Sequence, residues 1–150
     1  MDTIEVRTAA ISVTDEFQAL REGNRSDGAT AMFVGSVRDF NAGAGVDGLT
    51  LEHYPGMTEK SLQRIVDSAR ARWDLGRVRV IHRVGAMQVE DSIVFVGVTC
   101  AHRQAAFSAC QYLMDRLKTE APFWKLESRE TGKAWVAARD SDRLELQKWS

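Results

Sequence analysis

Apolar residues along the chain follow two periods, one typical of strands and the other typical of helices. Ile4 and Val6 alternate with polar residues, which predicts a half-buried strand near the N-terminus. Apolar residues three or four positions apart predict helices over about 14–23, 58–76 and 102–120. The inward face of the third helix is expected to consist of Ala106, Cys110, Leu113 and Leu117. Thr14 and Thr58 are the expected N-caps of the first two helices, and Pro122 prevents the third from continuing.

Extended segments account for much of the remaining chain. Apolar runs and alternation between turn residues predict strands over 29–37, 49–54, 78–84, 92–100, 123–128 and 134–138. The third and fourth of these segments are expected to pair across Gly85, and the last two to form a hairpin across Thr131-Gly132. The run Ile93–Val98 is apolar at every position except Gly97, so its strand is expected to be central and covered on both faces.

This order of elements favours an α+β fold over a doubly wound parallel sheet, because neighbouring strands pair and the helices are set apart. A length of 150 residues fits one domain, expected to have mixed or antiparallel sheets and three main helices. The glycine-rich stretch 41–45 interrupts regular structure. The tail from about residue 140 is expected to be a short helix or flexible.

The composition excludes several classes of function. A formal net charge of −1 gives no overall attraction to nucleic acid or a membrane surface, so any anion site must be a local cluster of cations. No apolar run approaches the length of a membrane span. Cys100 and Cys110 form neither a disulfide framework nor a CxxC pair, and no metal or cofactor site is expected. Both cysteines are expected to be small buried residues. The first residues lack the basic and apolar regions of a secretion signal, which favours a cytoplasmic location.

A histidine and an arginine stand where the central strand is expected to pass into the third helix. At this position, occupied by His102 and Arg103, free backbone N–H groups and the helix dipole favour an anion. A cation is disfavoured at a helix N-terminus unless an anion compensates it. The pair is therefore a candidate phosphate site. The alternative is that Arg103 is an ordinary solvated residue.

Other cations also lie at the ends of expected elements, where ligand contacts are common. Arg38 ends a strand before the glycine-rich stretch, and Arg139 ends the last strand. Lys118 and Lys125 lie on either side of the helix break at Pro122. Each has a simpler alternative: the two arginines are ordinary surface residues, Lys118 suits the last turn of a helix, and Lys125 faces solvent from a strand.

Motifs along most of the chain, from about Gly28 to Arg139, match one family in order. They are Gly35-Ser36-Val37-Arg38, the run LTLEHYPGMTEK (49–60), Gly76-Arg77-Val78, Ile93–Val98, Ala101-His102-Arg103 and the run LKTEAPFWK (117–125). Together they resemble the catalytic, large subunit family of molybdopterin synthase. The resemblance implies an α/β-hammerhead-like fold.

The resemblance implies a sulfurtransferase of molybdenum cofactor biosynthesis. In that family a homodimer binds two copies of a small ubiquitin-like carrier, giving a heterotetramer. The carrier's C-terminal Gly-Gly thiocarboxylate supplies the sulfur that converts cyclic pyranopterin monophosphate to the dithiolene of molybdopterin. By resemblance, Lys118 and Lys125 are catalytic, and His102 and Arg103 bind the pterin phosphate from the opposite subunit. The full set expected to contact substrate is Ser36, Val37, Arg38, His102, Arg103, Lys118, Lys125, Leu126, Glu127 and Arg139.

These residue types suit the implied chemistry. The phosphate and the thiocarboxylate are both anions, so a pocket in a nearly neutral protein needs clustered cations. Arginine stays charged and holds phosphate, whereas a lysine beside other cations gives up its proton more readily and can act as a base or nucleophile. The competing hypothesis is a non-catalytic module that binds a ubiquitin-like tail or a phosphorylated ligand. The presence of both lysines and the His-Arg pair argues against it.

Overall fold

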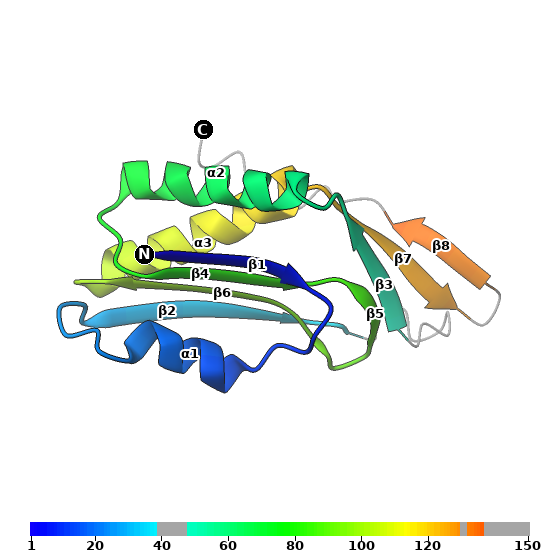
Figure 1. The fold of residues 1–150 in the computed structure, drawn as a ribbon, viewed down its shortest axis with the longest axis horizontal. Helices are drawn as coiled ribbons and strands as arrows, with labels where there is room; N and C mark the ends of the chain where they lie inside the picture. Colours follow the sequence, from blue (N-terminus) through cyan, green and yellow to red (C-terminus); the bar gives the residue numbers. More distant parts are fainter. Residues whose placement is uncertain (39–47, 130–131, 137–150) are drawn as a thin grey trace.

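Two four-stranded sheets and three helices make up the part of the chain that the structure describes (Figure 1). The computed structural model describes residues 1–38, 48–129 and 132–136. In chain order the elements are β1 (Asp2–Arg7), α1 (Val13–Arg21), β2 (Ala29–Ser36), β3 (Gly48–His53), α2 (Met57–Arg72), β4 (Val78–Arg83), β5 (Gly85–Gln88), β6 (Ser92–Cys100), α3 (Arg103–Glu120), β7 (Phe123–Arg129) and β8 (Gly132–Val136). The predicted α+β class is confirmed. The predicted tail lies outside the described residues.

The first sheet has the strand order β1-β4-β6-β2, with only the β1–β4 pair parallel. Helices α2 and α3 cover one face and α1 covers the other (Figure 1). As predicted, β6 is central, and every residue from Val94 to Cys100 is buried. Sequence analysis also predicted the inward face of α3 correctly: Ala106, Cys110, Leu113 and Leu117 are all buried.

The second sheet has the order β5-β3-β7-β8 and is entirely antiparallel. It lies beyond one end of the first sheet (Figure 1). Sequence analysis missed β5, because its four residues, Gly85–Gln88, carry no clear alternation. At Gly85 the backbone has φ +91°, which lets the chain turn out of β4 and into the second sheet. The predicted hairpin is confirmed as β7–β8, with its second strand beginning two residues earlier than expected.

Neither predicted N-cap is correct. Ser12, rather than Thr14, caps α1, and its side chain accepts a hydrogen bond from the backbone N–H of Asp15. Helix α2 begins one residue before Thr58, with Gly56 at the N-cap position. The buried Thr58 hydroxyl instead accepts from the Tyr54 N–H at 3.1 Å and donates to the Pro122 carbonyl at 3.3 Å. It thereby joins the start of α2 to the link between α3 and β7.

A hydrogen-bonded cluster fastens the loop before β2 to the end of β6. Asn24 donates to the Thr99 hydroxyl at 3.1 Å, and that hydroxyl donates to the Asp27 carboxylate at 2.8 Å. Gly76 packs directly against this cluster: a β-carbon built on it would lie 1.9 Å from Asp27 Oδ2 and 2.6 Å from Thr99 Oγ1. Gly76 is therefore required here by close packing. Helix α2 ends earlier than predicted, at Arg72.

Candidate active site

The N-terminal end of α3 carries the histidine and the arginine at which sequence analysis predicted a phosphate site. His102 is the N-cap, in extended conformation, and its side chain makes no capping hydrogen bond. Arg103 is the first helical residue, and the first turn contains no acidic residue. Both side chains are exposed. The first backbone N–H groups and two basic side chains therefore face solvent together at a positive helix end.

The C-terminal end of α3 carries Lys118, which is exposed in the last turn. The helix ends where the backbone N–H of the C-cap Ala121 donates to the Leu117 carbonyl. The chain then enters β7 within two residues. Lys125 is the third residue of that strand and pairs in register with Leu51 of β3. The two predicted catalytic lysines thus lie on consecutive elements joined by a tight link.

The segment that follows β2 contributes backbone anchoring and an exposed arginine. Val37 is only 3% exposed and packs in the core near the second sheet. Its backbone N–H donates to the Asp91 carbonyl, and its carbonyl accepts from the Glu90 N–H. Ser36 and Arg38, on either side, are exposed. The side chain of Val37 therefore positions its two neighbours.

The remaining predicted residues lie on β7 or beyond the described strands. Leu126 and Glu127 pair in register with Thr50 and Leu49 of β3. Arg139, predicted to end the last strand, lies outside the described residues. No group of three His, Cys, Asp or Glu residues suited to a metal ion occurs in the described part of the chain. Within the same residues, no helix combines the length and apolar character needed to cross a membrane.

One chain does not bring all the predicted cations together. Arg103 and Lys118 stand at opposite ends of the same helix, fifteen residues apart in the sequence. At 1.5 Å per residue this separates their backbones by about 22 Å. Lys118 therefore lies at the end of α3 that leads into the strand of Lys125, whereas His102 and Arg103 lie at the opposite end of the helix.

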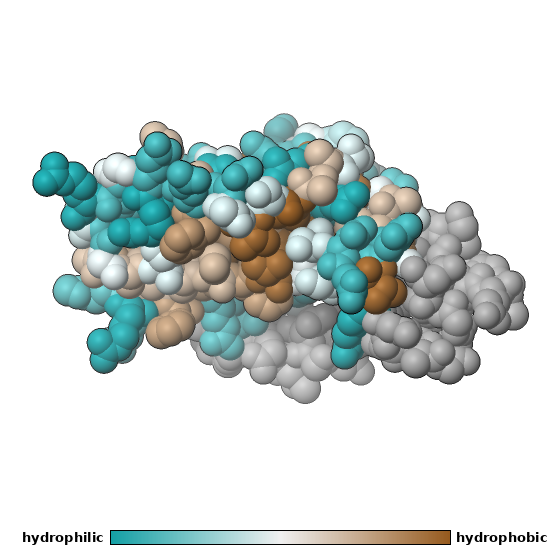
Figure 2. Space-filling view, turned by 90° about the horizontal axis from the view of Figure 1, so that it is seen from below, coloured by the Kyte–Doolittle hydropathy of each residue, from teal (hydrophilic) through white to brown (hydrophobic). Residues whose placement is uncertain are grey.

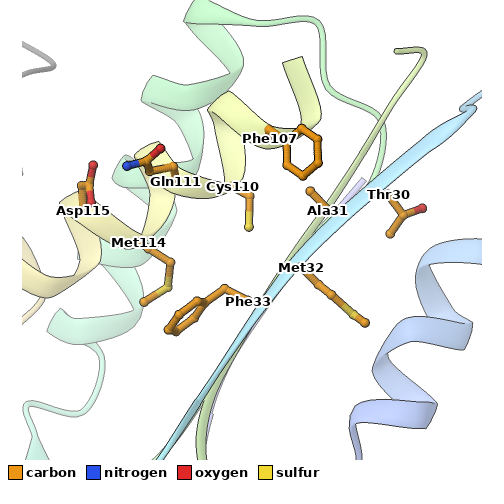
Figure 3. Close-up of a pocket in the computed structure, with 9 residues that line it drawn as sticks. All are labelled: Thr30, Ala31, Met32, Phe33, Phe107, Cys110, Gln111, Met114 and Asp115. Carbon is orange, nitrogen blue, oxygen red and sulfur yellow. The ribbon is translucent and has the colours of Figure 1, made fainter. Parts of the chain in front are cut away.

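A groove of about 630 Å³ runs between β2 and α3 (Figure 3). Its lining residues are Thr30, Ala31, Met32, Phe33, Phe107, Cys110, Gln111, Met114 and Asp115. Phe33 points towards Met114 and α3, whereas Met32 points to the side of α1 (Figure 3). Figure 2 shows apolar surface in the middle of this face, with polar residues above it and to its left. Sequence analysis missed this groove, although Phe107, Gln111 and Met114 repeat at helical spacing and mark a second face of α3.

The two cysteines are small buried residues, as predicted. Burial raises the pKa of the Cys110 thiol to about 11, and its Sγ lies 3.8 Å from the Val96 carbonyl, to which it donates. Burial, with Asp27 and Asp74 nearby, also raises the pKa of Cys100. A thiol with a raised pKa is a poor nucleophile at neutral pH. This favours chemistry based on the lysines.

Comparison with known proteins identifies the family. The family model described as MoaE protein matches residues 6–120. The chain belongs to the MoaE family. The molybdopterin synthase catalytic subunits of Vibrio cholerae and Escherichia coli are 54% and 55% identical over 146 residues, covering 97% of this chain and 97% of each relative. The solved MoaE protein of Burkholderia ambifaria has a TM-score of 0.85 and 46% identity, covering 99% of this chain and 98% of its own.

Membership of the MoaE family confirms the resemblance drawn from the motifs. The chain is an enzyme, a sulfur-transferring catalytic subunit of molybdopterin synthase that acts in molybdenum cofactor biosynthesis. The matched segment contains β2, the start of α3 and Lys118, and ends just before β7. The full-length relatives extend the similarity across the strand that carries Lys125.

Proposed function

We propose that this chain transfers sulfur from the C-terminal thiocarboxylate of a small ubiquitin-like carrier to cyclic pyranopterin monophosphate, with Lys118 and Lys125 as catalytic residues. The observation that carries the proposal is the placement of two lysines on consecutive elements, one exposed at the end of α3 and the other on β7. The curated relatives are named catalytic subunits, a name that implies a further subunit.

Each step of the proposed sulfur transfer requires either a proton transfer or the neutralisation of a negative charge. The thiocarboxylate sulfur attacks an oxygen-bearing side-chain carbon of the pterin, and the C–O bond at that carbon breaks. The oxygen leaves with the opened phosphate in one transfer and as water in the other, and the carrier is then joined to the pterin through sulfur. Water then displaces the carrier as a carboxylate and leaves the sulfur on the pterin. Lys118 and Lys125 transfer protons during attack, during release of the carrier and during opening of the cyclic phosphate. Arg38 and Arg139 balance negative charge in the same pocket.

We further propose that the active enzyme is a homodimer in which β2 of one chain pairs with β2 of the other. Within the described residues β2 is an edge of its sheet, and it contains neither proline nor a charged residue. Its Met32 and Phe33 are 46% and 42% exposed, and Phe107 across the groove is 69% exposed. The opposite edge, β1, carries charged residues that discourage pairing, whereas β2 offers unpaired backbone groups beside apolar side chains.

An antiparallel pair of β2 strands would also complete the active site. Strand β6 is antiparallel to β2, and the chain reverses direction between the end of β6 and the start of α3. Helix α3 therefore runs in the same general direction as β2. In the proposed dimer the two α3 helices therefore run antiparallel along the groove. Gln111, which lines the groove, is nearly midway between Arg103 and Lys118 along the helix. A two-fold axis near Gln111 would bring Arg103 of each chain level with the partner's Lys118.

The decisive experiment is reconstitution of the reaction in the cytoplasm-like, reduced conditions in which we expect the enzyme to work. The purified chain is mixed with stoichiometric thiocarboxylated carrier and the cyclic pterin monophosphate, and the dithiolene product is quantified. Lys118→Ala should lose at least 100-fold in rate while keeping the fold and most of the affinity for the carrier, because it removes a group that transfers protons during the reaction. A chain that binds the carrier but forms no product would instead be a non-catalytic binding module.

A further inference from the structure

The relative position of the two sheets determines how far Lys125 lies from Lys118. Lys118 is on α3, which packs on β2 and β6 of the first sheet. Lys125 is on β7, in the second sheet. Catalysis by both lysines needs the two elements to be held in a fixed arrangement, since a displacement of about 1 Å can lower a rate on the order of 100-fold.

Phe123, the first residue of β7, lies at the junction of the two sheets. Its side chain packs against the large core cluster beneath α2 and α3 and also against the smaller cluster beside β3. In the second sheet Phe123 pairs in register with His53 of β3, and the centroids of the two rings are 6.5 Å apart. Any shift of Phe123 therefore moves the start of β7, two residues before Lys125.

His82 of β4 provides a rigid surface for Phe123. The two rings are stacked, with centroids 3.8 Å apart and planes inclined by 19°. The histidine is 4% exposed, and its Nδ1 lies 3.0 Å from the backbone carbonyl of Arg83. Because a carbonyl only accepts, Nδ1 carries the proton, and this hydrogen bond fixes the plane of the imidazole ring. A leucine of similar bulk would have neither the flat face nor this anchor.

We infer that His82 is a positioning residue, which holds the β7 strand of Lys125 in place relative to the α3 helix of Lys118 by stacking on Phe123. The inference rests on the proposed function, since it assumes that both lysines act in one reaction. It assigns His82 no contact with substrate. Loss of the stack should consequently slow the chemical step and leave the binding of both substrates nearly unchanged.

The test compares His82→Leu, which removes the stack, with His82→Phe, which keeps a flat ring. A matched control is Val80→Ala, a destabilising change on the same strand in the core cluster. In the reconstituted reaction, His82→Leu should lower kcat at least 10-fold with KM for carrier and precursor within about twofold. His82→Phe should recover most of the rate, and Val80→Ala should keep the wild-type kcat despite a comparable fall in Tm.

Three results would overturn the inference: kcat unchanged in His82→Leu, an effect on KM alone, or an equal loss of kcat in Val80→Ala at matched Tm. If His82→Leu does not fold, Phe123→Leu removes the other ring of the stack and is judged by the same criteria. Failure of the proposed function has a different signature, because the wild-type chain itself would then form no product in this assay.

Discussion

Mixing two inactive variants, Arg103→Ala and Lys118→Ala, tests whether each active site is built from two chains. In one chain these residues are separated by about 22 Å along α3, too far for both to contact one small phosphorylated substrate. In the proposed antiparallel dimer, each site combines Lys118 of one chain with His102 and Arg103 of the other. A hybrid dimer then has one site with both substitutions and one site with neither.

The expected recovery follows from the symmetry. After random exchange of chains about half of the dimers are hybrids, and each has one intact site of two, so activity should return to about a quarter of the wild-type value. The measurement is the rate of dithiolene formation after exchange, with hybrid formation verified by differently tagged chains. Mixing His102→Ala with Arg103→Ala is the matched control: both changes are at the same end of α3, so neither hybrid site is intact. No recovery above the separate variants, after verified exchange, would show that each site comes from one chain.

Three further outcomes follow from the structure. Phe107→Asp should shift the protein towards monomer in analytical ultracentrifugation, because it places a charge in the apolar groove. The control Phe17→Asp, at an exposed position on α1, should leave the dimer intact. A stable Phe107→Asp dimer would refute the proposed interface. Gly76→Ala should destabilise the fold by about 2 kcal/mol in denaturant unfolding, since its β-carbon would overlap the Asp27 carboxylate, and wild-type stability would contradict the packing argument. With a pKa raised to about 11, the Cys110 thiol stays protonated at neutral pH, so its alkylation should accelerate only as the pH rises towards 11. Cys110→Ala should therefore keep most of the activity. A persulfide on Cys110 during turnover would exclude the lysine-centred mechanism.

Local patterns predicted most elements but not their boundaries. The apolar run of β6 and the inward face of α3 were predicted correctly because burial follows from periodicity alone. The cap of α1 was wrong because Ser12 and Thr14 both stand near the helix start. The cap of α2 was wrong because the tertiary contacts of Thr58 decide its role. Strand β5 was missed because its four residues are held in place by pairing with β3, a segment more than thirty residues away.

Motifs predicted which residues belong to the candidate site, whereas the positions of these residues in space required the fold. A motif names residue types in order, so it identified the His-Arg pair and the two lysines and, with them, the family. Whether such residues meet depends on distances across the chain that no motif contains.

By itself, the sequence determined the fold class, the central strand, the three helices and the family, because each depends on residue types at short spacing. Only the tertiary structure decided how the predicted cations are distributed over the fold. The rigid length of α3 separates Arg103 from Lys118, and in the proposed dimer the edge strand β2 is the surface through which a second chain would reunite them. The tertiary structure also placed His82 against Phe123, a residue forty-one positions later in the sequence. The junction of the two sheets is formed by pairing and packing between distant segments.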